Sequence, residues 1–193
     1  MAVKLPTKKE VDYATSILQK HAAYIGRIAI EWNSLHHTLG ELFVEVLAPD
    51  QQSAILAAWH AVPSDRSKRD MLKAAARAAL SADSRFCDEL EWACGQINAL
   101  EDNRNNAIHS PYALLLENGD LKFVPNLFSG SSRARKLRDK NLQLEFESYA
   151  KNIHTINWWL KILRGLVEAS AEDQAWPERP ALPRTAQASG RRS

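Results

Sequence analysis

The feature that most constrains the fold is a run of apolar residues spaced alternately three and four positions apart. It continues without a miss from residue 25 to residue 46. Because an α-helix repeats about every 3.6 residues, this spacing places all its members on one stripe of a long helix. Such a stripe is stable only when it is buried against other elements. Its members are Ile25, Ile28, Trp32, Leu35, Leu39, Leu42 and Val46.

Two later segments repeat this spacing, which predicts an all-α fold, an antiparallel helical bundle over residues 1–170. Thr7 and Glu10 have the spacing of a capping box. Pro49 and Asp50 should end the first long helix and open a shorter one, and another helix should end near Leu80. The apolar stripes of the two later long helices are Phe86, Leu90, Ala93, Ile97 and Leu100, and then Leu142, Phe146, Tyr149, Ile153, Ile156, Leu160, Leu163 and Val167.

Three segments lack the helical pattern. Residues 112–124 hold two short apolar runs around Asn118-Gly119, a pair that tolerates positive φ and favours an inserted β-hairpin. Residues 129–140 are rich in serine and basic side chains and are expected to be a loop. Residues 171–193, rich in Pro, Ala, Ser and Arg without periodicity, are expected to be a disordered tail.

Composition narrows the functional classes. The chain has 193 residues, of which 45% are hydrophobic and 25% charged, as in an ordinary globular domain. It has no apolar run of roughly 20 residues and no apolar stretch behind its N-terminal lysines, so we expect a cytoplasmic protein without membrane contact. The net charge of +2 implies that any nucleic acid is recognised locally. Cys87 and Cys94 lie seven residues apart on one predicted helix, too far for a disulfide, and no metal or cofactor motif is present.

The clearest functional candidates are Arg104 and His109. Arg104 takes a place on the second stripe where the spacing predicts an apolar residue, and Pro111 should end that helix close to His109. Five residues of ideal helix turn through 500°, so the two side chains would point about 140° apart. They converge only if the helix ends or loosens before His109, or if two chains contribute.

The segment from Asn103 to His109 has the form Arg-x4-His with Asn directly after the arginine. In an all-α bundle this resembles the HEPN superfamily, whose RNase members carry an Arg-x4-6-His motif; Glu31-Trp32-Asn33 in the first helix is similar to bacterial members. The resemblance implies a metal-independent endoribonuclease that cuts RNA in a site composed of two motifs. It thus implies a homodimer or a HEPN partner, and a toxin, antiphage or RNA-processing role with an antitoxin or defence-system partner. Some HEPN toxins have tyrosine where this chain has Pro111.

These two residue types suit RNA cleavage by the ribose 2′-hydroxyl. Histidine titrates near neutrality and can transfer the proton, which we assign to His109. Arginine stays charged and offers a planar set of donors that fits phosphate oxygens, so Arg104 is expected to bind phosphate and stabilise its developing charge.

Asn105, Tyr112, Arg133 and Arg135 are further candidates for substrate binding. Asn105 could hold a phosphate or cap the helix, and the basic segment could bind RNA phosphates or be a solvated loop. Beside the first stripe, His36 and His37 are more typical of surface or half-buried polar residues than of ligands.

A purely structural interpretation stays open for the main pair. Arg104 could lie along the stripe and pair with an acid such as Glu101, and His109 could be a helix-end residue favoured by the helix dipole. The protein would then be a noncatalytic module of the same fold that binds a protein or nucleotide partner.

Overall fold

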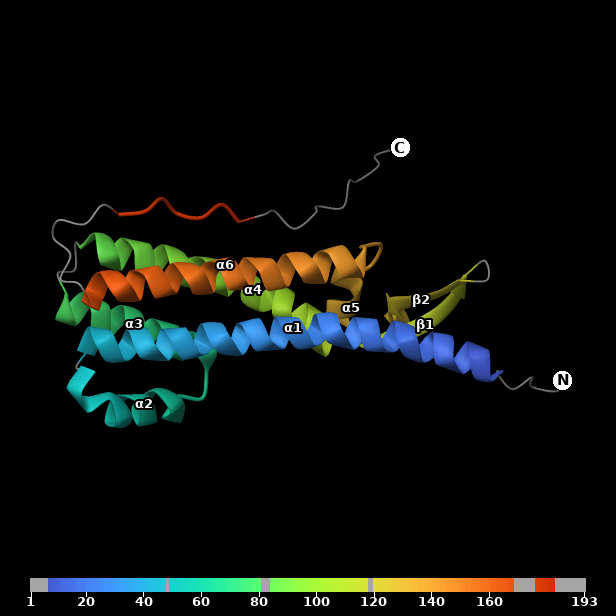
Figure 1. The fold of residues 1–193 in the computed structure, drawn as a ribbon, viewed down its shortest axis with the longest axis horizontal. Helices are drawn as coiled ribbons and strands as arrows, with labels where there is room; N and C mark the ends of the chain where they lie inside the picture. The colour runs from blue at the N-terminus through green and yellow to red at the C-terminus, as the bar shows by residue number, and fades with distance from the viewer. Residues whose placement is uncertain (1–6, 48, 81–83, 118–119, 169–175, 183–193) are drawn as a thin grey trace. The chain divides into compact units, whose positions relative to one another are not determined.

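The structure, a computed structural model, describes residues 7–47, 49–80, 84–117, 120–168 and 176–182. In these residues the chain forms six α-helices and one two-stranded sheet, which confirms the predicted helical fold with a small hairpin (Figure 1). No helix within these ranges is long and apolar enough to cross a membrane. The elements are α1 (Lys8–Leu47), α2 (Gln52–Ala61), α3 (Asp65–Ala79), α4 (Arg85–His109), β1 (Tyr112–Glu117), β2 (Asp120–Pro125), α5 (Ser132–Lys136) and α6 (Leu142–Glu168), with 3-10 turns at Pro49–Gln51 and Leu127–Ser129.

The chain divides into two compact units. Within the described ranges, the first unit holds residues 7–29 and 102–149, and the second holds residues 30–101 and 150–182. Since the divisions fall inside α1, α4 and α6, each of these helices contributes residues to both units. The bundle domain predicted over residues 1–170 therefore spans both units.

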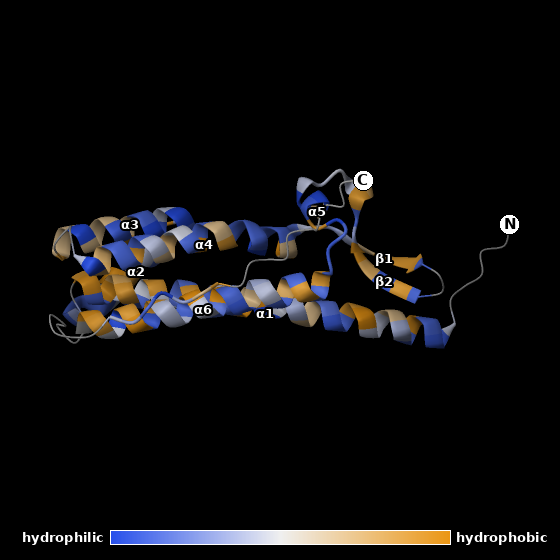
Figure 2. Ribbon diagram, turned by 90° about the horizontal axis from the view of Figure 1, so that it is seen from above, coloured by the Kyte–Doolittle hydropathy of each residue, from blue (hydrophilic) through white to orange (hydrophobic). Residues whose placement is uncertain are grey.

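The core of the second unit is formed by the predicted stripes. On α1, Trp32, Leu35, Leu39, Leu42 and Val46 are all buried. The α4 stripe and the α6 stripe from Ile153 to Leu163 are buried in the same way, whereas Val167 is half-buried. Apolar and polar residues alternate along these helices (Figure 2), as expected where one face packs inward and the other meets water. The spacing therefore identified the buried faces correctly.

The helix directions differ in part from the prediction. In the second unit α1 and α6 lie side by side and run parallel (Figure 1), because contacts between them keep one sequence separation. The contacts are His154 Nδ1 with Glu31 Oε2 at 3.0 Å, Asn157 Nδ2 donating to Ser34 Oγ at 2.9 Å, and Arg164 with Glu41. By contrast α3 and α4 are antiparallel, since Arg69 contacts Glu101 and Arg77 contacts Glu91. The antiparallel description thus fits α3 and α4 but not α1 and α6.

A charged side chain lies inside the second unit. Arg69 is only 1% exposed, and it donates from Nε and Nη2 to Asn98 Oδ1 at 3.0 and 2.7 Å and from Nη2 to Glu101 Oε2 at 2.6 Å. A guanidinium can be buried in this way because the carboxylate compensates its charge and planar donors meet fixed acceptors. Glu101, which was a possible partner of Arg104 in the structural interpretation, therefore binds Arg69.

The first unit is organised around the hairpin. The strands pair antiparallel from Tyr112 with Pro125 to Glu117 with Asp120, which confirms the hairpin; its predicted turn at Asn118-Gly119 lies outside the described residues. At the start of α1 the capping box is confirmed, since Thr7 N donates to Glu10 Oε2 at 2.6 Å and Glu10 N donates to Thr7 Oγ1 at 3.3 Å.

The basic segment is not entirely a loop. Residues Ser132–Lys136 form α5, which begins where Ser131 Oγ accepts a hydrogen bond from Ala134 N at 3.3 Å. Ala134 and Leu137 are its buried residues. A helix of about one turn presents too few residues for a periodic stripe, so the pattern could not predict it.

Part of the predicted tail also differs from expectation. In the described residues 176–182, Arg179 Nε binds Glu89 Oε2 at 2.7 Å and its guanidinium lies 5.3 Å from the Trp92 ring. Trp176 lies 5.2 Å from the Arg85 guanidinium. This segment therefore packs on α4 through polar and aromatic contacts, which have no periodicity to detect.

Candidate functional site

Arg104 and His109 lie at the C-terminal end of α4, as predicted. The helix continues to His109 and stops before Pro111, whose ring disfavours helical geometry in Ser110. Both residues belong to the first unit. The predicted end of the helix close to His109 is therefore confirmed.

The Arg104 guanidinium is oriented by its neighbour. Arg104 is half-buried, and its Nη1 donates to Asn105 Oδ1 at 2.8 Å. A planar guanidinium held at one nitrogen has a restricted orientation. In this structure Asn105 therefore has an orienting contact with Arg104.

His109 is exposed at the last position of α4. Since α4 neither ends nor loosens before it, the backbone directs Arg104 and His109 about 140° apart and separates them by about 7.5 Å along the axis. Of the two routes to convergence, loosening of the helix is not seen. The α4 backbone therefore does not bring the two side chains together within one chain.

Tyr112 connects the hairpin to the helix end. Its hydroxyl donates to the Ala107 carbonyl at 2.7 Å, and its ring stacks on Phe123 with centroids 4.9 Å apart. Burial raises the pKa of the Tyr112 hydroxyl well above its usual value, so it stays protonated. The hydroxyl hydrogen is committed to the chain itself, which makes Tyr112 a structural anchor beside the candidate site.

A histidine that the sequence did not single out packs beside this tyrosine. His21 on α1 is buried, with its ring centroid 3.8 Å from that of Phe123, 5.2 Å from Phe146 and 5.4 Å from Tyr112. Burial lowers the pKa of His21 to about 4, so its ring is neutral at pH 7. We call His21, Tyr112, Phe123 and Phe146 the aromatic cluster. His21 lies four positions before Ile25, at the next step of the α1 stripe, so the same spacing marks its position as buried.

The basic residues of the α5 region have different environments. Arg133 and Arg135 are both exposed, and Arg135 Nη2 donates to the Gly130 carbonyl at 3.0 Å. Lys140 is directed inward, where its Nζ lies 3.0 Å from Glu145 Oε2. Glu145 is only 4% exposed and also accepts from the Tyr149 hydroxyl at 2.7 Å. The structure thus gives Lys140 an internal role and leaves the Arg133 side chain at the surface.

No group of three or more histidine, cysteine, aspartate or glutamate side chains within the described ranges could hold a metal ion. The two cysteines lie in the core, where burial raises the pKa of Cys94 to about 11. A thiol with so high a pKa is a poor metal ligand and nucleophile at neutral pH.

Comparison with known proteins adds no relative to this description. No protein-family model matches the chain, and no curated protein or solved structure matches it either.

Proposed function

We propose that this protein is a metal-independent endoribonuclease of the HEPN type, with Arg104 and His109 as its catalytic pair. The observation that carries the proposal is their placement together at the end of α4, with the Arg104 guanidinium oriented by Asn105 and His109 open to solvent. An RNA strand needs access to both groups. Exposure of His109 and a half-buried, oriented arginine support that role.

The chemistry needs three actions at one phosphodiester. His109 takes the proton of the ribose 2′-hydroxyl, whose oxygen then forms a bond to phosphorus. Arg104 binds the nonbridging oxygens and stabilises the charge that they gather in the transition state. The bond from phosphorus to the 5′-oxygen breaks, and that oxygen leaves with the proton that His109 has taken from the 2′-hydroxyl. The products are a 2′,3′-cyclic phosphate and a 5′-hydroxyl.

The direction of the two side chains supports a homodimer. A 2′-hydroxyl and the adjacent phosphate oxygens lie within a few ångströms, whereas α4 directs Arg104 and His109 apart. A second copy related by a two-fold axis supplies a second arginine and histidine to the same site. One copy's His109 can then act with its partner's Arg104.

The competing proposal is a noncatalytic module that binds a protein or nucleotide partner. Two contacts favour it. The Tyr112 hydroxyl donates to the Ala107 carbonyl, and Arg135 donates to the Gly130 carbonyl. These two candidates for substrate binding thus use donors within the chain. Such a module would bind its partner with Arg104 or His109 replaced by alanine, and would cut no RNA.

The experiment is cleavage of a labelled mixed-sequence RNA in EDTA by the wild type, Arg104→Ala and His109→Ala at matched dimer content. We expect both variants to lose activity by at least about a hundredfold, the usual size of an acid–base or charge-stabilising contribution. Arg77→Ala and His154→Ala are matched controls, since each removes an exposed residue of the same type from the second unit. Equal cutting by all five proteins would contradict the assignment.

Mixing the two inactive variants tests the dimeric site. Subunit exchange produces about half heterodimers, and each heterodimer retains one Arg104 and one His109 on different chains. Partial recovery of cutting supports action across the dimer, and no recovery under confirmed exchange contradicts it.

A further inference from the structure

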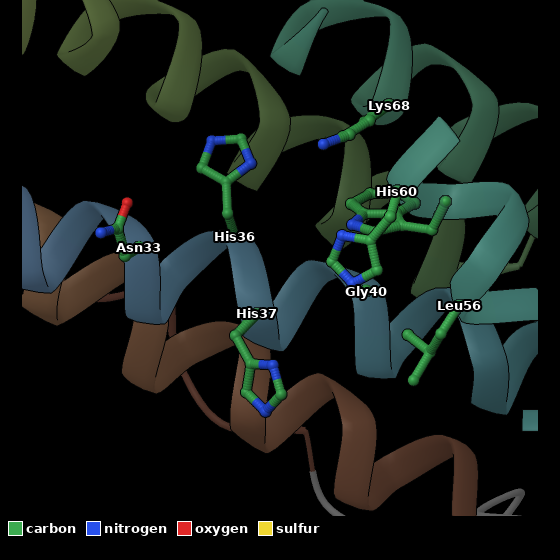
Figure 3. A pocket seen from close by; sticks show the side chains of 8 residues that line it. Asn33, His36, His37, Gly40, Leu56, His60 and Lys68 are labelled. Carbon is green, nitrogen blue, oxygen red and sulfur yellow. The ribbon is translucent and has the colours of Figure 1, made fainter. Parts of the chain in front are cut away.

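A small pocket lies in the second unit among α1, α2 and α3 (Figure 3). It encloses about 160 Å³. We call it the α1–α2–α3 pocket. Its lining residues are Asn33, His36, His37, Gly40, Leu56, Trp59, His60 and Lys68.

Gly40 and Trp59 shape one wall. A Cβ atom at Gly40 would lie 3.1 Å from Trp59 Nε1 and 3.2 Å from Trp59 Cδ1, which is tighter than nine in ten real Cβ contacts. Glycine therefore lets the indole lie directly against α1, where Trp59 is 1% exposed. The result is a flat aromatic wall held by the core.

The charge of the lining favours anions. Lys68 points into the pocket toward His36, while His37 points away on the other side of α1 (Figure 3). Lys68 Nζ lies 5.9 Å from the centre of the Trp59 ring, and no carboxylate in the described part of the chain forms an ion pair with it. The lining contains no acidic residue, so at neutral pH its fixed charge is positive.

His36 supplies a polar group deep in the pocket. Burial is the main cause that lowers its pKa to about 4, and the nearby charges of Arg69 and Lys68 lower it further, against Asp65 and Glu101. Its Nε2 lies 3.4 Å from Asp65 Oδ2. The ring is therefore neutral at pH 7, with one nitrogen that donates and one that accepts. An anion bound between Lys68 and His36 would offset the charge of Lys68 and so favour protonation of His36.

We propose that the α1–α2–α3 pocket binds a phosphate group, with Lys68 as its cation, His36 and His60 as hydrogen-bonding partners and Trp59 as an apolar wall. An engineered cavity of about 150 Å³ holds a benzene-sized ligand. The five heavy atoms of a phosphate fit this volume, and a whole nucleotide does not. A larger phosphate monoester would place its phosphate inside and its remaining atoms outside. The pocket is independent of Arg104 and His109, which belong to the other unit.

The test follows the histidine side chains by nitrogen-15 NMR during titration at constant ionic strength. Inorganic phosphate and phenyl phosphate are the two probes, and acetate is the comparison anion. We expect saturable shifts of the His36 and His60 signals and movement of His36 toward its protonated form. Saturation by inorganic phosphate alone identifies a free-phosphate site, and saturation by phenyl phosphate as well identifies a monoester site. No saturable shift with either probe overturns the proposal.

The Lys68 contribution is tested with matched lysine variants. Lys68→Gln should weaken phosphate binding by about tenfold, the effect of losing one charge-assisted hydrogen bond. Lys68→Arg keeps the charge and should bind within a few-fold of the wild type. Lys73→Gln is the control, because Lys73 lies on the same helix, pairs with Asp70 and does not line the pocket. Equal affinity of Lys68→Gln and Lys73→Gln, with unchanged thermal unfolding, overturns the assignment of Lys68.

Discussion

Polar side chains inside the two units have different surroundings. In the second unit, polar groups inside the bundle contact partners on other helices, as Arg69 contacts Asn98 and Glu101 and Asn157 contacts Ser34. In the first unit, His21 and Tyr112 are surrounded by rings, and one hydrogen bond joins Tyr112 to a backbone carbonyl. The comparison teaches that a buried polar side chain can be stabilised by partners on another helix, as Arg69 is, or mainly by aromatic packing, as His21 is.

The largest effect is expected from Arg69→Ala. The change removes a buried cation and leaves Glu101 and Asn98 without their main donor, which typically costs about 3 kcal/mol. Arg77→Ala, which breaks the exposed pair with Glu91, should cost less than about 1 kcal/mol. Urea unfolding of both variants measures the difference. If both variants lose the same free energy of unfolding, a buried ion pair contributes no more to stability here than an exposed one.

Acidification probes the aromatic cluster. Since the folded pKa of His21 is about 4, the unfolded chain, with a pKa near 6.5, takes up the proton first. The contribution of His21 to stability is therefore full above pH 6.5 and is lost as the pH falls toward 4, by an amount on the order of 2 kcal/mol. His21→Phe should flatten this part of the profile, whereas the exposed His154→Gln should not. If the stability of His21→Phe falls with pH as steeply as that of the wild type, protonation of His21 is not the cause of the loss.

Tyr112→Phe should cost about 1 kcal/mol, because it removes one hydrogen bond and keeps the stacked ring. The activity of the folded fraction should be unchanged if Tyr112 only anchors the hairpin. Chemical unfolding and RNA cleavage separate the two effects. A large loss of cleavage with unchanged stability would instead support the predicted role of Tyr112 in substrate binding.

The smallest effect is expected from Arg179→Ala. The arginine is 43% exposed, and its contacts with Glu89 and Trp92 are worth about 0.5–1 kcal/mol together. Lys161→Ala, an exposed change on α6, is the control. Thermal unfolding should move slightly in the first variant only. Identical shifts would show that residues 176–182 add nothing to the second unit.

How far the sequence predicts the fold depends on periodicity. The stripes identify the buried faces of α1, α4 and α6, because spacing of three and four fixes a helical face. Spacing says nothing about which helix a face meets, so the parallel neighbours α1 and α6 were not predicted. Arg69 lies in a segment whose pattern gives no reason to bury a cation. Its partners, Asn98 and Glu101, come from a helix about thirty positions further along the chain.

The candidate site was predictable in position but not in geometry. Pro111 marks the end of α4, which places His109 at the helix end. The proposed convergence of Arg104 with the histidine of a second copy is not a property of one chain, so no pattern in the sequence specifies it. The contact between Arg104 and Asn105 depends on their rotamers, which the identities of adjacent residues do not specify.

The constant separation of the contacts between α1 and α6 has a consequence for folding kinetics. Each contact joins residues 123 positions apart, whereas the contacts of Arg69 with α4 span only 29 to 32 positions. Closing the longer loop costs more chain entropy, so the parallel pair should form after the α3–α4 hairpin. Loss of a late contact mainly accelerates unfolding. The lifetime of the folded second unit would then be governed by the register between the first and last helices.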